Sequence, residues 1–344
     1  MMSKSIRVCL IGAGRVAKVH ASSLVSYTPQ ASLVALVDTN PEVLKQTAQQ
    51  FEVQATFNSL ENALEKAKFD AVVITTPTFT HKALAITAAE AKKHVLLEKP
   101  MAMSAAECAE INTIIAKNGV HLQIAYMRRF DPDFVLAAEK ITAGEIGEPM
   151  MIKSHSNGPG LPPAWAVDLK TSGGNLAEVN SHDLDCVRWL MSSNPERIYV
   201  EVANFKGKER GVTTEHFYDN LMANIKFESG GLGSVTGVCP CEYGYDARVE
   251  VIGKKGILVI GEMKSNAVVV CTNRDQGLIT PVFRSWANRC EWGYIREMKH
   301  FIECIINDQQ PRVTGEDGLW AVATHVAGTK SLLEERSVYL KEVM

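Results

Sequence analysis

The chain has 344 residues, of which 46% are hydrophobic and 22% charged, and its formal net charge is −3. This length allows two domains with sizeable cores, and the composition is that of an ordinary globular protein. The charge balance excludes the basic surface that nucleic acids or anionic membranes attract, and no apolar stretch is long enough to span a bilayer. Because the first predicted strand begins almost at once, we expect no signal peptide and a cytoplasmic protein.

The first 125 residues alternate between predicted strands and helices at the spacing of an α/β domain. Apolar runs predict strands over residues 6–11, 33–37, 55–57, 70–75, 94–98 and 120–125. Helical patterns lie between them, over residues 16–27, 41–50 and 81–91 and from residues 59 and 104 onward. We therefore expect a Rossmann domain with a doubly wound parallel sheet over residues 1–125.

A different pattern begins after residue 125. Helices are predicted over residues 131–143, 175–191, 293–307 and 315–334, with a loop over 158–163 and a mobile polar loop over 207–216. Strands are predicted over residues 150–156, from 195 onward, over 221–227, where apolar and polar residues alternate, and on to about 283. We expect residues 126–344 to form an α/β domain with a large, mostly antiparallel open sheet, whose last helices could pack back on the Rossmann domain. An open sheet face needs a cover, which predicts a homodimer or homotetramer through this sheet.

The cysteines are scattered, and most lie within apolar runs, as Cys9, Cys186, Cys271 and Cys304 do. This is typical of buried free thiols in a reducing compartment. Cys239-Pro240-Cys241 is the one close pair, and no second pair stands at a zinc-ligand spacing. We expect the end of a strand there and no metal.

The turn at residues 12–17, Gly-Ala-Gly-Arg-Val-Ala, follows the first apolar strand and opens the first helix. In this context a G-x-G-x-x-A motif predicts dinucleotide binding. Gly12 allows a tight turn, and Gly14 leaves room for the pyrophosphate. The free N–H groups of the first helical turn, from Arg15 and Val16 on, would hold the phosphates. A strand–turn–helix unit without a ligand is the alternative.

Asp38 ends the second predicted strand, where a carboxylate can accept hydrogen bonds from both adenosine ribose hydroxyls and would repel a 2′-phosphate. No basic residue follows before Lys45, so we expect NAD rather than NADP. The segment from Thr39 to Glu42 is also typical of a helix start, in which Asp38 would only mark the loop. The two interpretations are compatible.

Glu98-Lys99-Pro100 ends the fifth predicted strand, and the carboxyl ends of parallel strands face the cofactor crevice. A lysine before a rigid proline is positioned there; a solvated loop lysine is the alternative. In the predicted helix over 175–191, Glu178 and His182 stand four residues apart and would share a face, with Asp185 near it. Such a stripe can move protons because histidine titrates near neutrality, although a solvated polar face is the alternative.

Together these motifs resemble the Gfo/Idh/MocA family of glucose–fructose oxidoreductases and inositol dehydrogenases. The resemblance covers essentially the whole chain. Besides the glycine turn, the matching segments are residues 76–81, 98–100, 126–132, 144–147, 173–185 and 311–318. Residues 127–131 and 243–246 are most similar to inositol 2-dehydrogenases.

The resemblance implies an enzyme that oxidises a secondary hydroxyl of a sugar or cyclic polyol, such as an inositol, with NAD. Lys99 would stabilise negative charge on the reacting oxygen, His182 would act as the general base, and Glu178 would be the third catalytic residue. A cis peptide would precede Pro100. At the cofactor the resemblance places Gly12, Gly14, Arg15, Val16, Asp38, Thr75, Thr76, Pro77, His81, Glu98, Lys99, Pro100 and Arg129. At the substrate it places Lys99, Tyr126, His155, Trp165, Glu178, Ser181, His182 and Tyr245.

The chain departs from the inositol branch at several pocket positions. Glu178 replaces the usual Asp, Asn180 stands where a small residue is common, and residues 155–160 match its His-Arg-Asn-Pro pattern only loosely. The substrate and the oxidised carbon therefore stay open. A NAD-assisted glycosidase or sugar 3-dehydrogenase of the same family is one alternative. A non-catalytic NAD-binding regulator is another, but it would be expected to lack Lys99 or His182.

Overall fold

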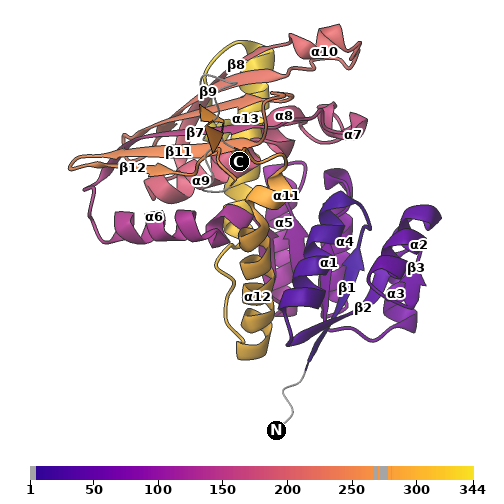
Figure 1. Ribbon diagram of the computed structural model, residues 1–344. Helices are drawn as coiled ribbons and strands as arrows, with labels where there is room; N and C mark the ends of the chain where they lie inside the picture. The colour runs from indigo at the N-terminus through magenta and orange to yellow at the C-terminus, as the bar shows by residue number, and fades with distance from the viewer. Residues whose placement is uncertain (1–4, 266–269, 272–277, 280) are drawn as a thin grey trace. The chain divides into compact units, whose positions relative to one another are not determined.

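The computed structural model describes residues 5–265, 270–271, 278–279 and 281–344 (Figure 1). These residues divide into two compact units. The first comprises the described residues up to Pro132, together with Trp292–Ala323 and Met344. The second comprises the described residues of Asp133–Glu291 together with Thr324–Val343.

The first unit is built on a six-stranded sheet in the order β3-β2-β1-β4-β5-β6, in which every pairing is parallel. Its strands are β1 (Ile6–Ile11), β2 (Ala31–Val37), β3 (Ala55–Phe57), β4 (Ala71–Ile74), β5 (His94–Glu98) and β6 (Leu122–Ala125). The order reverses between β1 and β4, as in a doubly wound Rossmann sheet, which confirms the predicted fold. The carboxyl ends of β1, β4 and β5 therefore neighbour one another at one edge.

The helices of this unit begin in different ways, and some of them have a side-chain cap. They are α1 (Arg15–Tyr27), α2 (Pro41–Gln50), α3 (Leu60–Lys66), α4 (His81–Glu90), α5 (Ala105–Asn118) and α12 (Glu291–Asn307), with short 3₁₀ turns η1 (Thr78–Thr80) and η2 (Met127–Phe130). Asn40, Ser59 and Ser104 each accept hydrogen bonds from backbone N–H groups in the first turn that follows.

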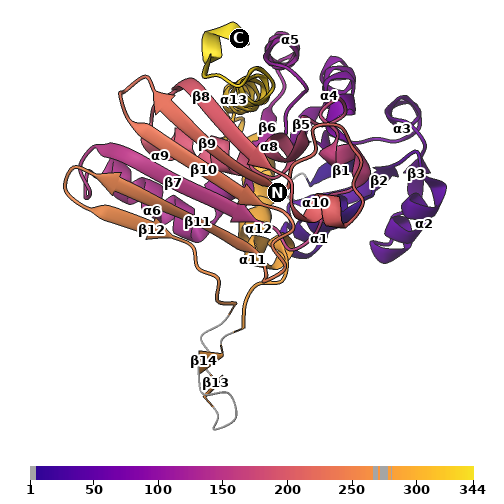
Figure 2. The same ribbon diagram turned by 90° about the horizontal axis from the view of Figure 1, so that it is seen from above.

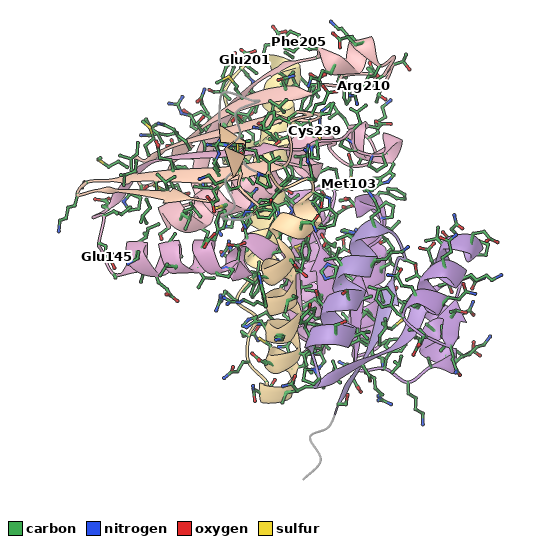
Figure 3. All side chains as sticks on the ribbon, in the orientation of Figure 1. Met103, Glu145, Glu201, Phe205, Arg210 and Cys239 are labelled. Carbon is green, nitrogen blue, oxygen red and sulfur yellow. The ribbon has the colours of Figure 1, made fainter. Side chains whose placement is uncertain are left out.

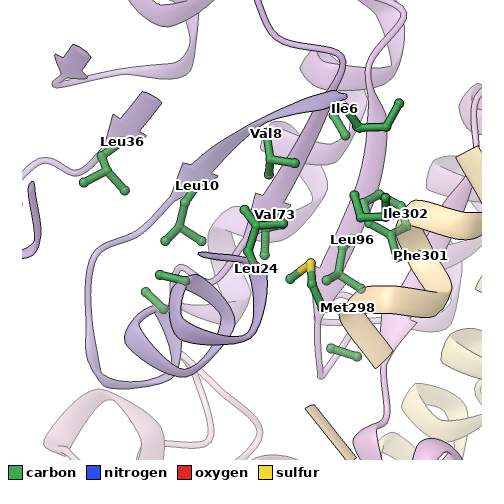
Figure 4. Packing of buried hydrophobic residues seen from close by; sticks show 14 of the residues in the cluster. Ile6, Val8, Leu10, Leu24, Leu36, Val73, Leu96, Met298, Phe301 and Ile302 are labelled. Atoms are coloured by element: carbon green, nitrogen blue, oxygen red, sulfur yellow. The ribbon is translucent and has the colours of Figure 1, made fainter. Parts of the chain in front are cut away.

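Helix α12 contributes to the first unit's core although it lies far along the chain. Its residues Met298, Phe301 and Ile302 are buried in one cluster with Val73, Leu96 and other residues of the parallel sheet (Figure 4). The next helix, α13 (Gly315–Glu334), contributes residues to both units.

The second unit is built on a seven-stranded sheet in the order β12-β11-β7-β10-β9-β8-β15 (Figure 2). Its strands are β7 (Pro149–Asn157), β8 (Pro195–Ala203), β9 (Asn220–Phe227), β10 (Leu232–Val238), β11 (Asp246–Gly253), β12 (Ile257–Ile260) and β15 (Val338–Tyr339). Only β7 and β10 pair in parallel in this sheet, so the predicted, mostly antiparallel sheet is confirmed for the described residues.

The two faces of this sheet differ. Helix α9 (Ser181–Met191) packs against β7, and the last part of α13 lies against Ile198 and Val200 of β8. On β9, Leu221, Ala223, Ile225 and Phe227 are buried, whereas Met222 is 60% exposed on the other face. The predicted half-exposed strand is therefore confirmed.

Two predictions in the second unit were wrong. The helix expected over residues 175–191 is two helices, α8 (Gly174–Glu178) and α9, with a break at Val179 and Asn180. The side-chain amide of Asn180 donates to the carboxylate of Asp183 and to the carbonyl oxygen of Thr236, and these bonds compete with helix continuation. In the predicted polar loop, residues Lys206–Glu209 form the short helix α10.

The remaining helical segments of the second unit are α6 (Pro132–Thr142), α7 (Ala164–Val167), α11 (Trp286–Arg289) and η3 (Leu340–Glu342). Strands β13 (Val270–Cys271) and β14 (Leu278–Ile279) form a separate antiparallel pair. The predicted strands up to residue 283 lie partly outside the described residues. Within the described part of the chain, no helix is both long and apolar enough to cross a membrane.

Candidate functional site

The glycine turn has one glycine that the fold requires and one that it does not. Gly12 has φ +88°, and a Cβ there would lie 2.9 Å from the backbone carbon and oxygen of Thr75. At Gly14 a Cβ would meet no described atom within 4 Å. Gly14 is the N-cap of α1, which has neither a side-chain cap nor an acidic residue in its described first turn. The space and the N–H groups at this helix start therefore suit a pyrophosphate.

Asp38 links the glycine turn to the next helix. Its Oδ2 accepts a 2.7 Å hydrogen bond from the amide of Ala13, and its Oδ1 accepts one of 2.8 Å from the amide of Asn40. Asn40 in turn caps α2 through the amides of Glu42 and Val43. Both interpretations of Asp38 are thus compatible with the structure. Because each carboxylate oxygen has two lone pairs and Asp38 is partly exposed, acceptor capacity is left for a ribose.

Thr75 ties the loop after β4 to the glycine turn. Its hydroxyl donates to the carbonyl oxygens of Ile11 and Gly12, at 3.0 and 3.1 Å. The hydroxyls of Thr76 and Thr80 are 2.6 Å apart across Pro77, which precedes η1. These bonds fix the two loops at the ends of neighbouring strands.

The segment that carries Lys99 has buried partners on both sides. Before it, Glu98 Oε1 lies 2.8 Å from Nε2 of His20, and Glu98 Oε2 accepts the amide of Lys99 at 3.0 Å. After it, the peptide bond between Lys99 and Pro100 is cis, as expected. The carbonyl oxygen of Pro100 lies 2.8 Å from Nδ1 of His81, and His81 Nε2 lies 2.8 Å from the carbonyl oxygen of Thr76.

Glu98 and His81 were both predicted at the cofactor, and the structure gives both side chains partners within the protein. The two residues are buried, at 5% and 1% exposure, as is His20 of α1. No motif marked His20 as functional. The signal was a histidine on the same helix stripe as the buried residues Ala17 and Leu24, where an apolar residue is expected.

Glu297 of α12 is a second buried group that the sequence reasoning missed. Neither of its carboxyl oxygens has a hydrogen-bond partner among the described residues. Burial raises the pKa of Glu297 well above its usual value, and the negative charge of Glu98 raises it further. The neutral, protonated acid is therefore favoured. The available signal was an acidic residue within the buried stripe of Tyr294, Met298 and Phe301.

Tyr126 and Arg129 follow β6, and both are buried. The guanidinium of Arg129 lies 3.0 Å from a carboxylate oxygen of Asp317, at the start of α13. Its backbone carbonyl oxygen accepts a hydrogen bond from Arg312. This predicted cofactor residue is thus held by charged groups of its own unit.

In the second unit, Asp183 fixes the start of α9. Its Oδ1 accepts a 2.6 Å hydrogen bond from the hydroxyl of Ser154 on β7, and its Oδ2 accepts one of 2.9 Å from Asn180. His182 is 9% exposed, and Ser181 is fully buried. Because the helix breaks before Ser181, Glu178 ends α8, and the predicted shared helix face of Glu178 and His182 was wrong.

The start of α8 is held by Tyr218 and by two glycines. Tyr218 accepts the amide of Leu176 on its hydroxyl oxygen, and its carbonyl oxygen accepts the side chain of Asn175. Burial raises the pKa of Tyr218, so it stays neutral. Gly173 and Gly174 both have positive φ, and a Cβ on either would come within 3 Å of a neighbouring side chain.

Other predicted substrate residues are more scattered. His155 lies on the sheet face opposite Ser154, and its Nε2 is 3.2 Å from a carboxylate oxygen of Asp246. Ser154 faces α9, so His155 lies on the face that α9 does not cover. Trp165 is 37% exposed on α7, which packs against α8. Tyr245 is buried at the start of β11.

Cys239, which is labelled in Figure 3, directly follows β10, and Cys241 stands two residues later. Their thiols donate to the carbonyl oxygens of Gly160 and Gly244, both at 2.9 Å. Burial raises the pKa of Cys239 to about 12. Among the described residues, no group of three or more His, Cys, Asp or Glu side chains could hold a metal ion.

Two family models match the chain. Residues 6–126 match the NAD-binding Rossmann fold of an oxidoreductase family, Gfo/Idh/MocA, and residues 138–340 match the C-terminal alpha/beta domain of the same family.

Relatives align along nearly the whole chain. It is 32% identical to the scyllo-inositol 2-dehydrogenase (NAD(+)) of Bacillus subtilis strain 168, over 98% of this chain and 97% of that protein. It is 31% identical to the Myo-inositol 2-dehydrogenase of Thermotoga maritima, over 98% of this chain and 100% of that protein.

Solved structures agree with this. Apo scyllo-inositol dehydrogenase from Lactobacillus casei superposes with a TM-score of 0.90 at 25% identity, covering 99% of this chain and 100% of its own. A myo-inositol dehydrogenase from Corynebacterium glutamicum gives 0.87 at 26% identity, covering 98% and 99%. The chain therefore belongs to the Gfo/Idh/MocA family of oxidoreductases.

Proposed function

We propose that this protein is an NAD-dependent dehydrogenase that oxidises a secondary hydroxyl of a cyclic polyol of the inositol class. The observation that carries the proposal is the pairing of full-length similarity to inositol 2-dehydrogenases with a fixed lysine, Lys99, at the carboxyl end of β5. Polyhydroxylated rings offer several equivalent hydroxyls, so the oxidised carbon depends on how the chain orients the ring.

In the proposed reaction, Lys99 and His182 act on the same hydroxyl. The Lys99 ammonium donates a hydrogen bond to the reacting oxygen and stabilises the negative charge that develops there. His182 accepts the hydroxyl proton as a general base. Bound NAD supplies the acceptor for the hydride that leaves the carbinol carbon. Reduction of the ketone would use the same groups in reverse.

Glu178 is the proposed third residue of the site. Glu178 is the last residue of α8, and His182 lies in the next helix, α9. The hydroxyl oxygen of Tyr218 anchors α8 by accepting the amide of Leu176. The Glu178 carboxylate can accept hydrogen bonds from ring hydroxyls that do not react. Since Glu is one methylene longer than the usual Asp, we propose that it selects among ring hydroxyls.

We further propose that the sheet of the second unit joins copies of the chain into a homodimer or homotetramer. Its open face carries large apolar side chains that are about half exposed or more: Met222, Leu232, Ile257 and Val259. The strand registers place all four on the face opposite Ser154 and α9. A cytoplasmic location is proposed with it, because thiols such as those of Cys9, Cys108 and Cys304 are free and buried.

The test is a substrate panel followed through NADH absorbance. Inositols, aldoses, sugar acids and glycosides are offered with NAD or NADP, and Lys99→Met serves as the control with strongly reduced turnover. We expect NADH from at least one inositol, and at least about a hundredfold higher kcat/KM with NAD because Asp38 repels a 2′-phosphate. Release of free sugar from a glycoside without net NADH would instead support the glycosidase alternative. A protein that binds NAD but turns over no member of the panel would contradict the proposal.

A further inference from the structure

We propose that His81 is a positioning residue, and that its contact with the carbonyl oxygen of Pro100 sets where the Lys99 ammonium stands. The inference rests on the proposed role of Lys99. It assigns His81 a place behind the reacting groups instead of at the cofactor surface.

The Lys99 segment is fixed from within the protein on both sides. Upstream, the Glu98 carboxylate accepts the Lys99 amide and lies 2.8 Å from His20. Downstream, Pro100 lies 2.8 Å from His81 through its carbonyl oxygen. Only Lys99 lies between these two contacts, so its backbone has little freedom. His20 belongs to α1, and His81 belongs to α4.

His81 is buried, and both of its ring nitrogens contact the protein backbone. The residue is 1% exposed, and each ring nitrogen lies 2.8 Å from a backbone carbonyl oxygen, one of Pro100 and one of Thr76. Both partners can only accept hydrogen bonds. The ring thus joins the loop after β4 to the loop after β5, and neither nitrogen is left to contact a ligand.

The number of protons on the His81 ring decides how many of its two contacts can be hydrogen bonds. A ring that carries two protons donates to both carbonyl oxygens, whereas a neutral ring donates to only one of them. Burial lowers the pKa of His81, which favours the neutral ring. A neutral ring therefore donates a hydrogen bond to only one of the two carbonyl oxygens at a time. Because the two contacts use different ring nitrogens, a substitution can remove one contact and keep the other. The Pro100 contact acts on the residue next to Lys99, while the Thr76 contact acts on the loop after β4, whose residues Thr75, Thr76 and Pro77 are expected at the cofactor.

Two substitutions that introduce an amide side chain, His81→Asn and His81→Gln, test the two contacts separately. Asparagine places its amide nitrogen near the position of Nδ1, and glutamine places its amide nitrogen near that of Nε2. His81→Asn should therefore keep the Pro100 contact, and His81→Gln should keep the Thr76 contact. His81→Ala removes both. His94→Gln is the matched control, since His94 begins β5 at the end opposite Glu98.

We expect His81→Ala and His81→Gln to lower kcat by about ten- to a hundredfold, the effect of a misplaced catalytic group. His81→Asn should recover at least about tenfold of the loss in His81→Ala. His81→Gln should leave the dissociation constant for NAD within about threefold of wild type, whereas His81→Asn should raise this dissociation constant by more. Tryptophan fluorescence titration measures NAD binding, and thermal unfolding checks that each variant is folded.

The rate of acylation of Lys99 by an N-hydroxysuccinimide ester gives a second readout that needs no substrate. Peptide mass spectrometry should find this rate changed in His81→Gln and restored in His81→Asn. Equal kcat in the two amide variants, or an unchanged acylation rate in His81→Gln, would overturn the inference. So would a full additional kcat loss when His81→Gln is combined with Lys99→Met, because a residue acting through Lys99 cannot add to its removal. If Lys99→Met alone keeps its turnover, the proposed role of Lys99 fails although the protein is still a dehydrogenase, and acylation still tests the contact.

Discussion

The Lys99 segment and the α8–α9 junction, the two regions proposed to carry the chemistry, are held by different kinds of bonds. Around Lys99, buried side chains hold backbone groups at the carboxyl end of a parallel strand. At α8–α9, the polar side chains of Asn180, Asp183 and Ser154 hold one another across a helix break. Topology therefore brings the first region to one edge of the sheet, where buried side chains fix it, whereas the second region depends on a few polar side chains alone.

The largest expected effect tests whether the junction carries the general base. His182→Asn should lower kcat by about a hundred- to ten-thousandfold, the usual contribution of a positioned base. NAD binding and thermal stability should stay near wild type, because the bonds of Asp183 that hold α9 are untouched. Steady-state kinetics with an inositol measure the effect. A kcat within fivefold of wild type would remove His182 from the mechanism.

The next prediction compares how the two regions fail. Asp183→Ala leaves the buried Ser154 hydroxyl and Asn180 amide without their shared acceptor, and should lower the free energy of unfolding by about 3–4 kcal/mol. Activity should fall with it, since α9 loses its anchor. Chemical denaturation measures the loss, and Asp185→Ala, also a buried acid of α9, is the comparison. A loss below 1 kcal/mol would mean that apolar packing alone fixes the junction.

A matched glycine pair separates fold from binding in the first region. Gly12→Ala strains a residue at φ +88° and crowds Thr75, and should lower the free energy of unfolding by about 2–3 kcal/mol. At Gly14 a Cβ would point into open space and φ is −75°, so Gly14→Ala should change the free energy of unfolding by less than about 1 kcal/mol. The same substitution should weaken NAD binding at least about tenfold. Calorimetry of both variants checks this. Unchanged NAD affinity in Gly14→Ala would mean that the pyrophosphate does not approach there.

The smallest effect concerns Glu297 and pH. Because its native pKa is raised, its stabilising contribution is complete below the unfolded value of about 4.3 and is lost as pH rises toward the native value. Glu297→Gln removes this titration. The variant should gain about 1 kcal/mol relative to wild type between pH 5 and 8, a difference seen in denaturation at several pH values. A parallel pH dependence in both proteins would mean that Glu297 is not buried as an acid.

Much of the first unit could be predicted from local patterns. Strand β5 and helix α2 have the predicted bounds, because apolar runs and caps such as Asn40 are local signals. The roles of His20 and His81 could not be predicted in the same way. Thr76 is a local partner of His81, but Glu98 and the carbonyl oxygen of Pro100 come from the end of β5, which only the folded sheet brings near the two histidines.

The second unit shows the same limit more strongly. Periodicity predicted one helix across residues 175–191, because α8 and α9 share an apolar pattern that continues through the break. The break depends on Asn180 reaching Thr236, which is 56 residues away in sequence. The alternation of residues 221–227 predicted a half-exposed strand correctly, since burial on one face leaves a local period of two.

The sequence by itself determined the dinucleotide fold, the expectation of NAD and the residues that are proposed to carry the reaction. These properties depend on spacing and on side-chain chemistry, which are local. Only the tertiary structure decided which of these side chains have buried partners within the protein, as Glu98 and His81 do, and which lie on the sheet face opposite Ser154, as His155 does. The physical reason is that hydrogen-bond partners and sheet faces are set by long-range packing, which a linear pattern does not contain.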